Sequence, residues 1–428
     1  MYVNEKTYNY DSYIIHTVKT DKFKNGYIEV NFVEDIESIN PCLRNYMTLL
    51  MGYSSLNYPS KRDMKIASEN LYDAAFTCSS SRVGYHMIST CSIDFLHPKF
   101  IKEKNYLKDL LTFYFDLIMN PHIQNSSWNQ ESAERIKERI HASIDSYKET
   151  PTGYASVESR KRLFPTSYSG KRLVGTHEEV DQITLQDLAR EYEEMIQNSM
   201  CEIVVVGDFD MDELSKTIHQ IFYKPSIVKK NIQDTIFHEK KPYYQELYEG
   251  PYNQTQVLQY YLLDALTPKE KNYVVPLFQS ILGTGALSDK LGDYLRIQES
   301  LCYTYASSFY SFDGYFLMAT GIQYQNLNRT LECLEKAMED MKKGRITQSE
   351  LDSHKQKILT NIKFQKDSIY GIAQNTYNHQ VLGLASFDSM MQEVPKVTIQ
   401  DLKNLTKKMH KTYTYILKEN EGDTIEED

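Results

Sequence analysis

The spacing of apolar and polar residues predicts strands in the second half of this chain. The run QTQVLQYYLL at 254–263 is typical of a strand. The stretch TYASSFYSFDGYFLMATGIQY at 304–324 carries apolar residues on both sides of Asp313 and Gly314, a dipeptide typical of a hairpin turn. This region is therefore expected to form a strand followed by a hairpin.

A helix is predicted between that strand and the hairpin. Thr267 is suited to the N-cap, Pro268 to the first helical position and Glu270 to the position that closes a capping box. One face of the helix then carries large side chains, at Tyr273, Leu277 and Ile281. Pro276 should kink this helix and Gly283 should end it. A second capping box, Thr347 with Glu350, predicts another helix within 346–358.

The chain contains an internal repeat. ITLQDL at 183–188 recurs as VTIQDL at 397–402, which is 397 − 183 = 214 residues later. Each copy predicts a capping box at the start of a helix: Thr184 with Asp187, and Thr398 with Asp401. Each predicted helix is followed by a β-rich run.

A second match supports the repeat. Residues 71–90 and 301–320 align without a gap at a separation of 301 − 71 = 230 residues, close to the first. The coincident pairs are Leu71/Leu301, Ser81/Ser311, Gly84/Gly314, Tyr85/Tyr315 and Thr90/Thr320. Two matches in the same order at similar separations indicate two homologous halves.

Strands and helices occur in separate groups within each half, which predicts an α+β fold. We expect two homologous domains, each a mostly antiparallel sheet with helices packed on one face. The predicted N-terminal domain is 1–225 and the predicted C-terminal domain is 246–428. Residues 226–245 are assigned as a linker, because this region is rich in Lys, Pro, Asn and Gly and lacks sustained helical periodicity.

Charge and composition exclude several classes of protein. The net charge is −10 and no basic tract resembles a nucleic-acid footprint, so we expect no DNA or RNA partner. No apolar run approaches the length of a membrane span, and the N-terminus has no signal-peptide pattern. The six cysteines are scattered without a CxxC pair. A cytoplasmic protein with reduced thiols is the expectation.

The common catalytic motifs are absent. The sequence contains no GxSxG, GxxxxGK[ST] or GxGxxG, and no two of its eleven histidines are three or four residues apart. Neither HExxH nor HxxEH is therefore present. No single motif indicates an autonomous enzyme.

Several stretches in order resemble the pitrilysin/insulinase family of inverted-zincin metallopeptidases, the peptidase M16-like proteins. They are LFPTSYSGKRLVGTHEEVDQITLQDLAREY at 163–192, VVVGDFD at 204–210, ILGTGALSDKLGDYLRIQESLCYTYASSFYSF at 281–312 and ITQSELDSHKQKI at 346–358. The resemblance spans nearly the whole chain. It implies the duplicated α+β fold, with the chain forming half of a clam-shell.

Active members of this family carry HxxEH on a helix of the first domain. Counting back from Tyr58 and Pro59 places Asn45, Thr48 and Leu49 at the positions that the resemblance gives to His, Glu and His. The later glutamate ligand would fall near Ser143. Because Leu49 cannot ligate a metal and Thr48 cannot act as a general base, this chain alone should not be a zinc peptidase. We expect no cofactor in this chain and zinc in a partner.

The second domain retains a different pair that the resemblance marks as functional. Arg296 and Tyr303, seven residues apart, match the family's "R…Y" pattern, and Gly283 and Gly285 match its glycine turn as substrate-binding positions. A phenol can donate to the oxygen of an attacked peptide bond, and a guanidinium can hold backbone carbonyls. If helical geometry continues through the interval, both side chains share one face. The following strand would offer an edge to an extended peptide.

The segment also departs from the family pattern. Gln298, Glu299 and Ser300 replace the usual Lys-Arg-Gly, which reverses the local charge. The alternative interpretation makes Arg296 an exposed helix residue and Tyr303 a buried aromatic at the start of a strand.

Three hypotheses for function follow. The first is a non-catalytic subunit of a heterodimeric zinc peptidase that processes peptides, with an HxxEH-bearing homologous partner; leader removal in bacteriocin maturation is one setting. The second is a structural or peptide-binding protein of the same fold without a role in proteolysis. The third, an autonomous enzyme with another mechanism, has no supporting motif. A homodimer of the isolated chain stays open.

Overall fold

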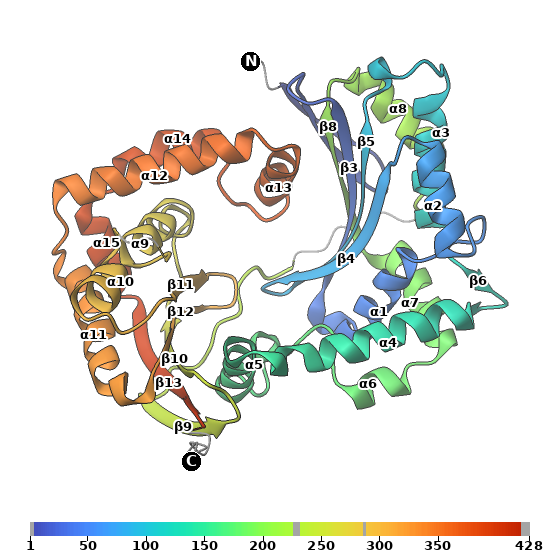
Figure 1. Ribbon diagram of the computed structural model, residues 1–428. Helices are drawn as coiled ribbons and strands as arrows, with labels where there is room; N and C mark the ends of the chain where they lie inside the picture. Colours follow the sequence, from blue (N-terminus) through green and yellow to red (C-terminus); the bar gives the residue numbers. More distant parts are fainter. Residues whose placement is uncertain (1–3, 226–231, 286–287, 421–428) are drawn as a thin grey trace, which may run out of the picture. The chain divides into compact units, whose positions relative to one another are not determined.

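The computed structural model describes residues 4–225, 232–285 and 288–420, which form two compact units (Figure 1). Unit 1 comprises Met1–Ile144, Arg172–Asp234 and Phe364–Ser386. Unit 2 comprises Asp145–Lys171, Thr235–Lys363 and Phe387–Asp428. Each unit therefore includes a segment from the other half of the sequence. Residues 226–231 of the predicted linker lie outside the described residues, and the boundaries at 225 and 246 stay a prediction about the homologous halves.

Unit 1 is built on a six-stranded sheet with the order β1-β2-β8-β3-β5-β4. Its strands are β1 (Asn4–Asn9), β2 (Ile14–Lys19), β3 (Asn25–Asp35), β4 (Ala75–Val83), β5 (His86–Leu96) and β8 (Met200–Gly207). Neighbouring strands are antiparallel except for β2 and β8, which run parallel. The short strands β6 (Ile123–Gln124) and β7 (Ser127–Trp128) form a separate hairpin.

Unit 2 is built on a five-stranded sheet with the order β11-β12-β10-β13-β9. Its strands are β9 (Tyr244–Gly250), β10 (Thr255–Leu263), β11 (Tyr305–Tyr310), β12 (Tyr315–Ile322) and β13 (Met409–Glu419). Only β13 and β9 run parallel. This order repeats β4-β5-β3-β8-β2 of unit 1, including the parallel pair at the same place. The predicted α+β fold with two homologous, mostly antiparallel sheets is confirmed.

Helices cover one face of the unit 1 sheet and enclose its apolar core. They are α1 (Pro41–Met51), α2 (Lys61–Asn70), α3 (Tyr106–Met119), α4 (Gln130–Ser146), α6 (His177–Gln182), α7 (Leu185–Asn198) and α8 (Met211–Ile221). The core-facing residues Val30 and Phe32 of β3 are fully buried together with Met47 of α1 and Leu111 of α3. The alternate residues of β3 face the opposite side of the sheet.

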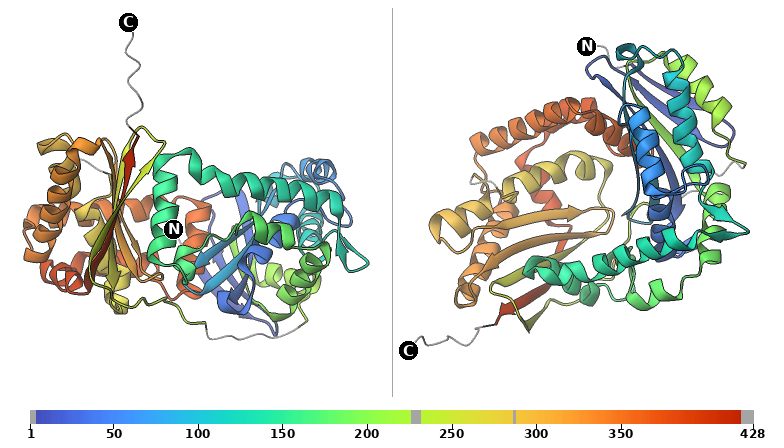
Figure 2. Two further views of the ribbon diagram at one scale, coloured as in Figure 1. Left: turned by 90° about the horizontal axis from the view of Figure 1, so that it is seen from below. Right: turned by 45° about the vertical axis from the view of Figure 1, so that its right-hand side comes forward.

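The unit 2 sheet is also covered by helices, with α5 (Pro151–Leu163) on one face and the others on the opposite side (Figure 2). These other helices are α9 (Val275–Leu282), α10 (Lys290–Gly292), α11 (Leu327–Lys343), α12 (Gln348–Lys366), α14 (Phe387–Glu393) and α15 (Ile399–Thr406). Short 3₁₀ turns occur at η1 (Ile36–Ser38), η2 (Pro98–Phe100), η3 (Tyr147–Glu149), η4 (Tyr168–Gly170), η7 (Tyr324–Asn326) and η8 (Val394–Lys396). In the part of the chain that the structure describes, no helix has the length and apolarity needed to cross a membrane.

The local signals of the repeat are confirmed. Thr184 caps α7 and Thr398 caps α15, and in both helices the Asp side chain three residues later returns to the backbone of the cap. The aligned glycines Gly84 and Gly314 both occupy hairpin turns with left-handed backbone, at φ 58° and φ 66°. A side chain at either position would be strained, so these glycines fix the same turn in both halves.

The predicted helix after Thr267 forms, with a modification at its start. Thr267 and Glu270 make the expected capping box. The next residues, Glu270–Val274 (η5), are π-helical, and ordinary α-helix begins at Val275. Because Pro276 has no N–H for the carbonyl four residues earlier, the backbone widens over this turn. The predicted kink is thus a π-helical turn.

One helix from each half of the sequence packs on the sheet that is formed by the other half. In unit 1, α13 (Ile369–Gln380) contacts β8, β2 and β3, and the Tyr370 ring packs edge-on against Tyr27 at 5.3 Å. In unit 2, α5 packs on β10 and β13, and the Ser159 hydroxyl lies 2.6 Å from the Tyr260 hydroxyl. The left view of Figure 2 shows α5 on one face of the sheet and the orange helices on the other. Each sheet is thus covered on both faces only when the whole chain is present.

The exchanged helices predict that the two halves will not fold well separately. Fragment 1–225 lacks α13 and leaves its contact face of β2, β3 and β8 uncovered. Fragment 232–428 lacks α5. The α13 residues Ile372, Ala373 and Tyr377 are buried, and burying each large apolar side chain stabilises a fold by roughly 1.5–3 kcal/mol. We expect each fragment alone to lose cooperative thermal unfolding in circular dichroism, and coexpressed fragments to copurify as one complex.

The control is the intact chain carried through the same measurements. A fragment 1–225 that unfolds cooperatively at the temperature of the intact chain would show that α13 is dispensable for unit 1.

Candidate functional site

Helix α1 presents the positions at which the family carries metal ligands. The helix begins after Asn40, whose side chain accepts hydrogen bonds from the backbone N–H groups of Cys42 and Leu43, and Pro41 occupies its first turn. The helix packs on the sheet of unit 1 and against α7. Its inward side carries residues 45 and 48, one helical turn apart.

The side chains on this part of α1 do not form a metal site. Asn45 is only 7% exposed, and its Nδ2 has no hydrogen-bond partner among the described residues. The Thr48 hydroxyl donates to the Arg44 carbonyl at 2.8 Å and lies 2.8 Å from the Ser89 hydroxyl. Leu49 is half-buried against the apolar core. The Asn45 amide, the hydrogen-bonded Thr48 hydroxyl and the Leu49 alkyl chain do not form a set of ligands for a zinc ion.

The position predicted for the later ligand does not supply one either. Ser143 lies on α4, and its backbone carbonyl accepts a hydrogen bond from Arg172 at 2.9 Å. Among residues 4–225, 232–285 and 288–420, no group of three or more His, Cys, Asp or Glu side chains could hold a metal ion. Helix α1, to which the resemblance assigns the metal motif, therefore carries side chains that do not fit a metal ion.

A histidine pair on α4 and α6 was not anticipated from the sequence, since its members are 36 residues apart. His141 and His177 stack, and their Nδ1 atoms are 2.5 Å apart. Asp181 contacts the opposite nitrogen of His141, Nε2, at 3.2 Å. The three groups therefore do not converge on one point, and their contacts join α4 to α6.

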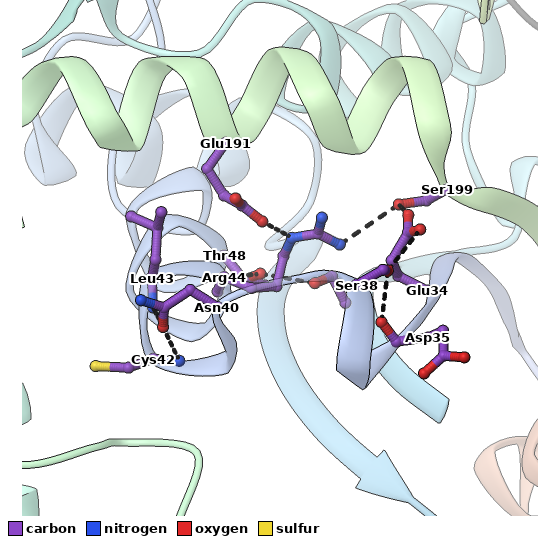
Figure 3. A network of polar contacts seen from close by, with 11 residues as sticks. Glu34, Asp35, Ser38, Asn40, Cys42, Leu43, Arg44, Thr48, Glu191 and Ser199 are labelled. Atoms are coloured by element: carbon purple, nitrogen blue, oxygen red, sulfur yellow. Dashed lines mark hydrogen bonds and ion pairs between the residues drawn. The ribbon is translucent and has the colours of Figure 1, made fainter. Parts of the chain in front are cut away.

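A buried ionic network fixes α1 in the core (Figure 3). Arg44 is 1% exposed, and its Nε lies 2.5 Å from Oε1 of Glu191 on α7. The Nη1 atom of Arg44 donates a hydrogen bond to the Ser199 hydroxyl at 3.4 Å. That hydroxyl in turn donates to the carboxylate of Glu34 on β3 at 2.9 Å. One guanidinium thus connects α1, α7 and β3.

Burial dominates the electrostatics of this network. Desolvation raises the pKa of Glu191, and the charge of Arg44 acts in the opposite direction. Desolvation also lowers the pKa of Arg44, against the favourable charge of Glu191. Each ion is costly to bury alone, so each depends on the other.

Arg296 lies on a widened helical turn of unit 2. The segment Asp293–Gln298 (η6) is π-helical and follows α10. The Arg296 side chain is half-buried, and its guanidinium makes no hydrogen bond or ion pair with the residues that the structure describes. Burial raises the pKa of the Cys302 thiol and of the Tyr305 phenol, and the positive charge of Arg296 opposes both shifts. The guanidinium therefore lies near these two residues without being bound to either.

Tyr303 is 88% exposed and lies two residues before β11. The alternative of a buried aromatic at the start of a strand is wrong. Helical geometry does not continue from Arg296 to Tyr303, because the helix ends at Gln298 and Ser300 has a left-handed backbone, φ 52°, so the condition for a shared helical face is not met. Within the described residues no hydrogen bond, ion pair or ring contact joins the Arg296 and Tyr303 side chains. Their shared role stays a prediction.

Gly283 and Gly285, the two predicted glycine positions, each have a different structural reason for being glycine. Gly283 ends α9 with an extended backbone, and a Cβ there would lie 2.6 Å from the Leu291 side chain. Its carbonyl accepts hydrogen bonds from the backbone N–H of Ser307 at 3.0 Å and from the Ser307 hydroxyl at 2.7 Å. Gly285 has a left-handed backbone, φ 89°. A role in binding substrate stays a prediction for both.

The edge of β11 is partly occupied. Ser307 donates its N–H to Gly283, and its carbonyl accepts from the Gln279 side chain at 2.8 Å. The middle of this edge strand therefore has its outer hydrogen-bonding groups satisfied within unit 2. Pairing with an extended peptide would be restricted to the ends of the strand.

Known proteins resemble this chain over nearly its whole length. Residues 182–358 match the family described as Peptidase M16 inactive domain. A probable inactive metalloprotease of Bacillus subtilis (strain 168), YmfF, is 20% identical over 424 residues, covering 98% of this chain and 99% of that protein.

Solved structures share the fold. A conserved protein from Enterococcus faecalis V583 superposes with a TM-score of 0.89 at 21% identity, covering 97% of this chain and 99% of that one. A peptidase M16 inactive domain from Pseudomonas fluorescens has a TM-score of 0.81 at 17% identity, with 98% of both chains covered. These findings confirm the family resemblance drawn from the sequence and support a non-catalytic M16-like protein.

The Arg44 network predicts an asymmetric response to mutation. Replacing Arg44→Met leaves Glu191 buried without its cation, and we expect a loss of about 3–5 kcal/mol in the free energy of unfolding at neutral pH. The double change Arg44→Met with Glu191→Leu removes both charges and should recover most of that loss. Urea denaturation followed by circular dichroism measures all three chains.

The deficit of Arg44→Met should shrink as the pH falls. A carboxyl whose folded pKa is raised binds its proton more tightly in the folded chain, so its cost is greatest above the folded pKa and disappears below the unfolded one. Burial already raises the pKa of Glu191, and loss of Arg44 raises it further. A double variant no more stable than the single one would contradict this account.

Proposed function

We propose that this relative of the M16 metallopeptidases is the non-catalytic subunit of a heterodimeric zinc peptidase that processes peptides. Its partner would be a homologous subunit that carries HxxEH. The observation that carries the proposal is a contrast between the units. Helix α1 has no metal ligands, whereas Arg296 holds an uncommitted guanidinium and Tyr303 an 88% exposed phenol at the positions that the resemblance assigns to substrate and transition-state binding.

The chemistry of these two side chains fits such a role. Attack on a peptide bond develops negative charge on the carbonyl oxygen, and the Tyr303 O–H can donate a hydrogen bond to it. The Arg296 guanidinium offers several fixed N–H donors to backbone carbonyls of the substrate. The metal-dependent step would belong wholly to the partner subunit, where the zinc is expected.

The exposure of Tyr303 is consistent with completion of the site by a partner. In the isolated chain water competes for the phenol, so a hydrogen bond to substrate contributes little. Exclusion of water by a second subunit would strengthen the same donor. The supporting observation is that the large aromatic side chain of Tyr303 is exposed on the surface of unit 2 and is not buried in its core.

A structural or peptide-binding protein without a role in proteolysis is the second candidate. It is favoured by the absence of a hydrogen bond, ion pair or ring contact between Arg296 and Tyr303 in the described part of unit 2. Under this alternative no HxxEH subunit copurifies. Leader removal in bacteriocin maturation, a cytoplasmic location and a homodimer of the isolated chain are further proposals that copurification and mass spectrometry from the native cell would test.

The proposal predicts that both side chains matter for turnover by the heterodimer. The chain is mixed with an HxxEH-bearing M16-like subunit from the same cell, and hydrolysis of a fluorogenic peptide is followed. Tyr303→Phe should lower kcat roughly 100- to 1,000-fold, since one lost oxyanion donor has an effect of this order. Arg296→Ala should raise KM as well as lower kcat, because it also loses ground-state contacts.

Two matched variants control for general damage. Tyr310→Phe removes a hydroxyl from a partly exposed tyrosine on β11, and Arg345→Ala removes an exposed arginine of the same unit. Both should retain full activity and partner binding. Unchanged activity in Arg296→Ala and Tyr303→Phe, with a complex that does form, would eliminate the proposed role.

A further inference from the structure

Two cysteines face each other across the edge of the unit 1 sheet. Cys78 on β4 and Cys91 on β5 are direct partners in the antiparallel register. Their sulfur atoms are 2.8 Å apart, closer than two unbonded sulfurs normally approach, and both thiols are free. Partners at this register have Cβ atoms about 4.5–5.5 Å apart, near the range that a disulfide spans.

The other cysteines are separated from this pair in the fold. Cys42 lies on α1, Cys201 on β8, Cys302 just before β11 and Cys333 on α11. Cys201 is in the same sheet, where β3 lies between its strand β8 and the β5 strand of Cys91. Cys78 and Cys91 are therefore the two thiols that the sheet register brings together.

Cys78 is placed where a cross-link would act on an edge strand. Strand β4 ends the unit 1 sheet, and its outer side has no strand partner among the described residues. On its inner side, β4 lies close to Gly52, the residue that follows α1. A Cβ added to Gly52 would lie 3.3 Å from the Cβ and from the backbone N of Cys78. Edge strands open more readily than central ones, so a link to β5 would restrain the least supported strand of the sheet.

We propose that Cys78 and Cys91 are a site of reversible oxidation, forming a disulfide that fixes β4 to β5 beside the end of α1. The oxidant class is a low-molecular-weight disulfide such as oxidised glutathione. The Cys78 thiolate attacks one sulfur of this reagent, forms a mixed disulfide and releases one small thiol. The Cys91 thiolate then attacks the Cys78 sulfur, closes the protein disulfide and releases the second small thiol. Two protein thiols are oxidised and one reagent disulfide is reduced.

The order of attack follows from exposure. Cys78 is half-buried and Cys91 is fully buried, so the reagent reaches Cys78 first. Burial raises the pKa of the Cys78 thiol well above its usual value, which keeps the thiolate scarce at neutral pH. The reaction should therefore be slow in the folded chain and accelerate as the pH rises.

The site is tested on the full chain with oxidised glutathione as the probe, at neutral and mildly alkaline pH. Remaining thiols are then alkylated, and the digest is analysed by mass spectrometry. We expect one linked pair of peptides, containing Cys78 and Cys91, that is lost on treatment with dithiothreitol. It should form several-fold faster at the higher pH, whereas the other four cysteines stay alkylated.

Variants separate the pair from general thiol reactivity. In Cys78→Ser, Cys91 should stay reduced, because it is buried and has lost its partner. In Cys91→Ser, glutathione should remain on Cys78 as a stable mixed disulfide. The proposal is overturned if both thiols of the native chain stay alkylated after oxidation, if either pairs with another cysteine, or if glutathione persists on Cys78 while Cys91 is present.

Hydrogen exchange tests the effect on the strand. The backbone amides of β4 should exchange several-fold more slowly in the oxidised chain than in the reduced one, and the amides of β1, the opposite edge strand, should not change. Equal exchange of β4 in both forms would show that the disulfide does not restrain the edge.

Discussion

The ion pair between Arg44 and Glu191 is the constraint on which the first unit depends. A guanidinium that is 1% exposed cannot remain charged in the core without a carboxylate, so α1 and α7 must stay in contact wherever this pair exists. The link through Ser199 to Glu34 extends this requirement to β3. Helical geometry then fixes the direction in which residues 45 and 48 project. The network therefore holds in place the helix to which the resemblance assigns the metal ligands.

At the positions that the resemblance assigns to metal ligands, the first unit makes mainly neutral contacts. The hydroxyl pair of Thr48 and Ser89 fills one position, and Leu49 joins the apolar core at another. Among residues 45, 48 and 49, Asn45 keeps a buried N–H group without a hydrogen-bond partner in the described part of the chain. The second unit differs, because a half-buried guanidinium and an exposed phenol remain outside its internal bonding. The buried ion pair and the unbound Arg296 and Tyr303 side chains thus lie in different units.

Signals confined to a few residues were predictable from the sequence. The capping boxes at Thr184 and Thr398 and the glycine turns at 84 and 314 depend on local backbone geometry, which the residue types specify. Contacts set by register or by packing were not predictable. The pairing of Cys78 with Cys91, the stacking of His141 on His177 and the exchange of α5 and α13 join residues far apart in the chain. The sequence left open whether helical geometry continues from Arg296 to Tyr303, and the left-handed backbone of Ser300 shows that it does not.

The parallel strand pairs have a consequence for the order in which the protein is made. In each sheet the parallel pair joins the first part of a half to its last strand, β2 to β8 and β9 to β13. A growing chain cannot complete the first sheet until Gly207 has left the ribosome, and its α13 cover arrives only with Gln380. The completed first sheet therefore keeps this face uncovered while residues 208–380 are still being made. Chaperones that cover such a face until translation ends would therefore assist the folding of this chain.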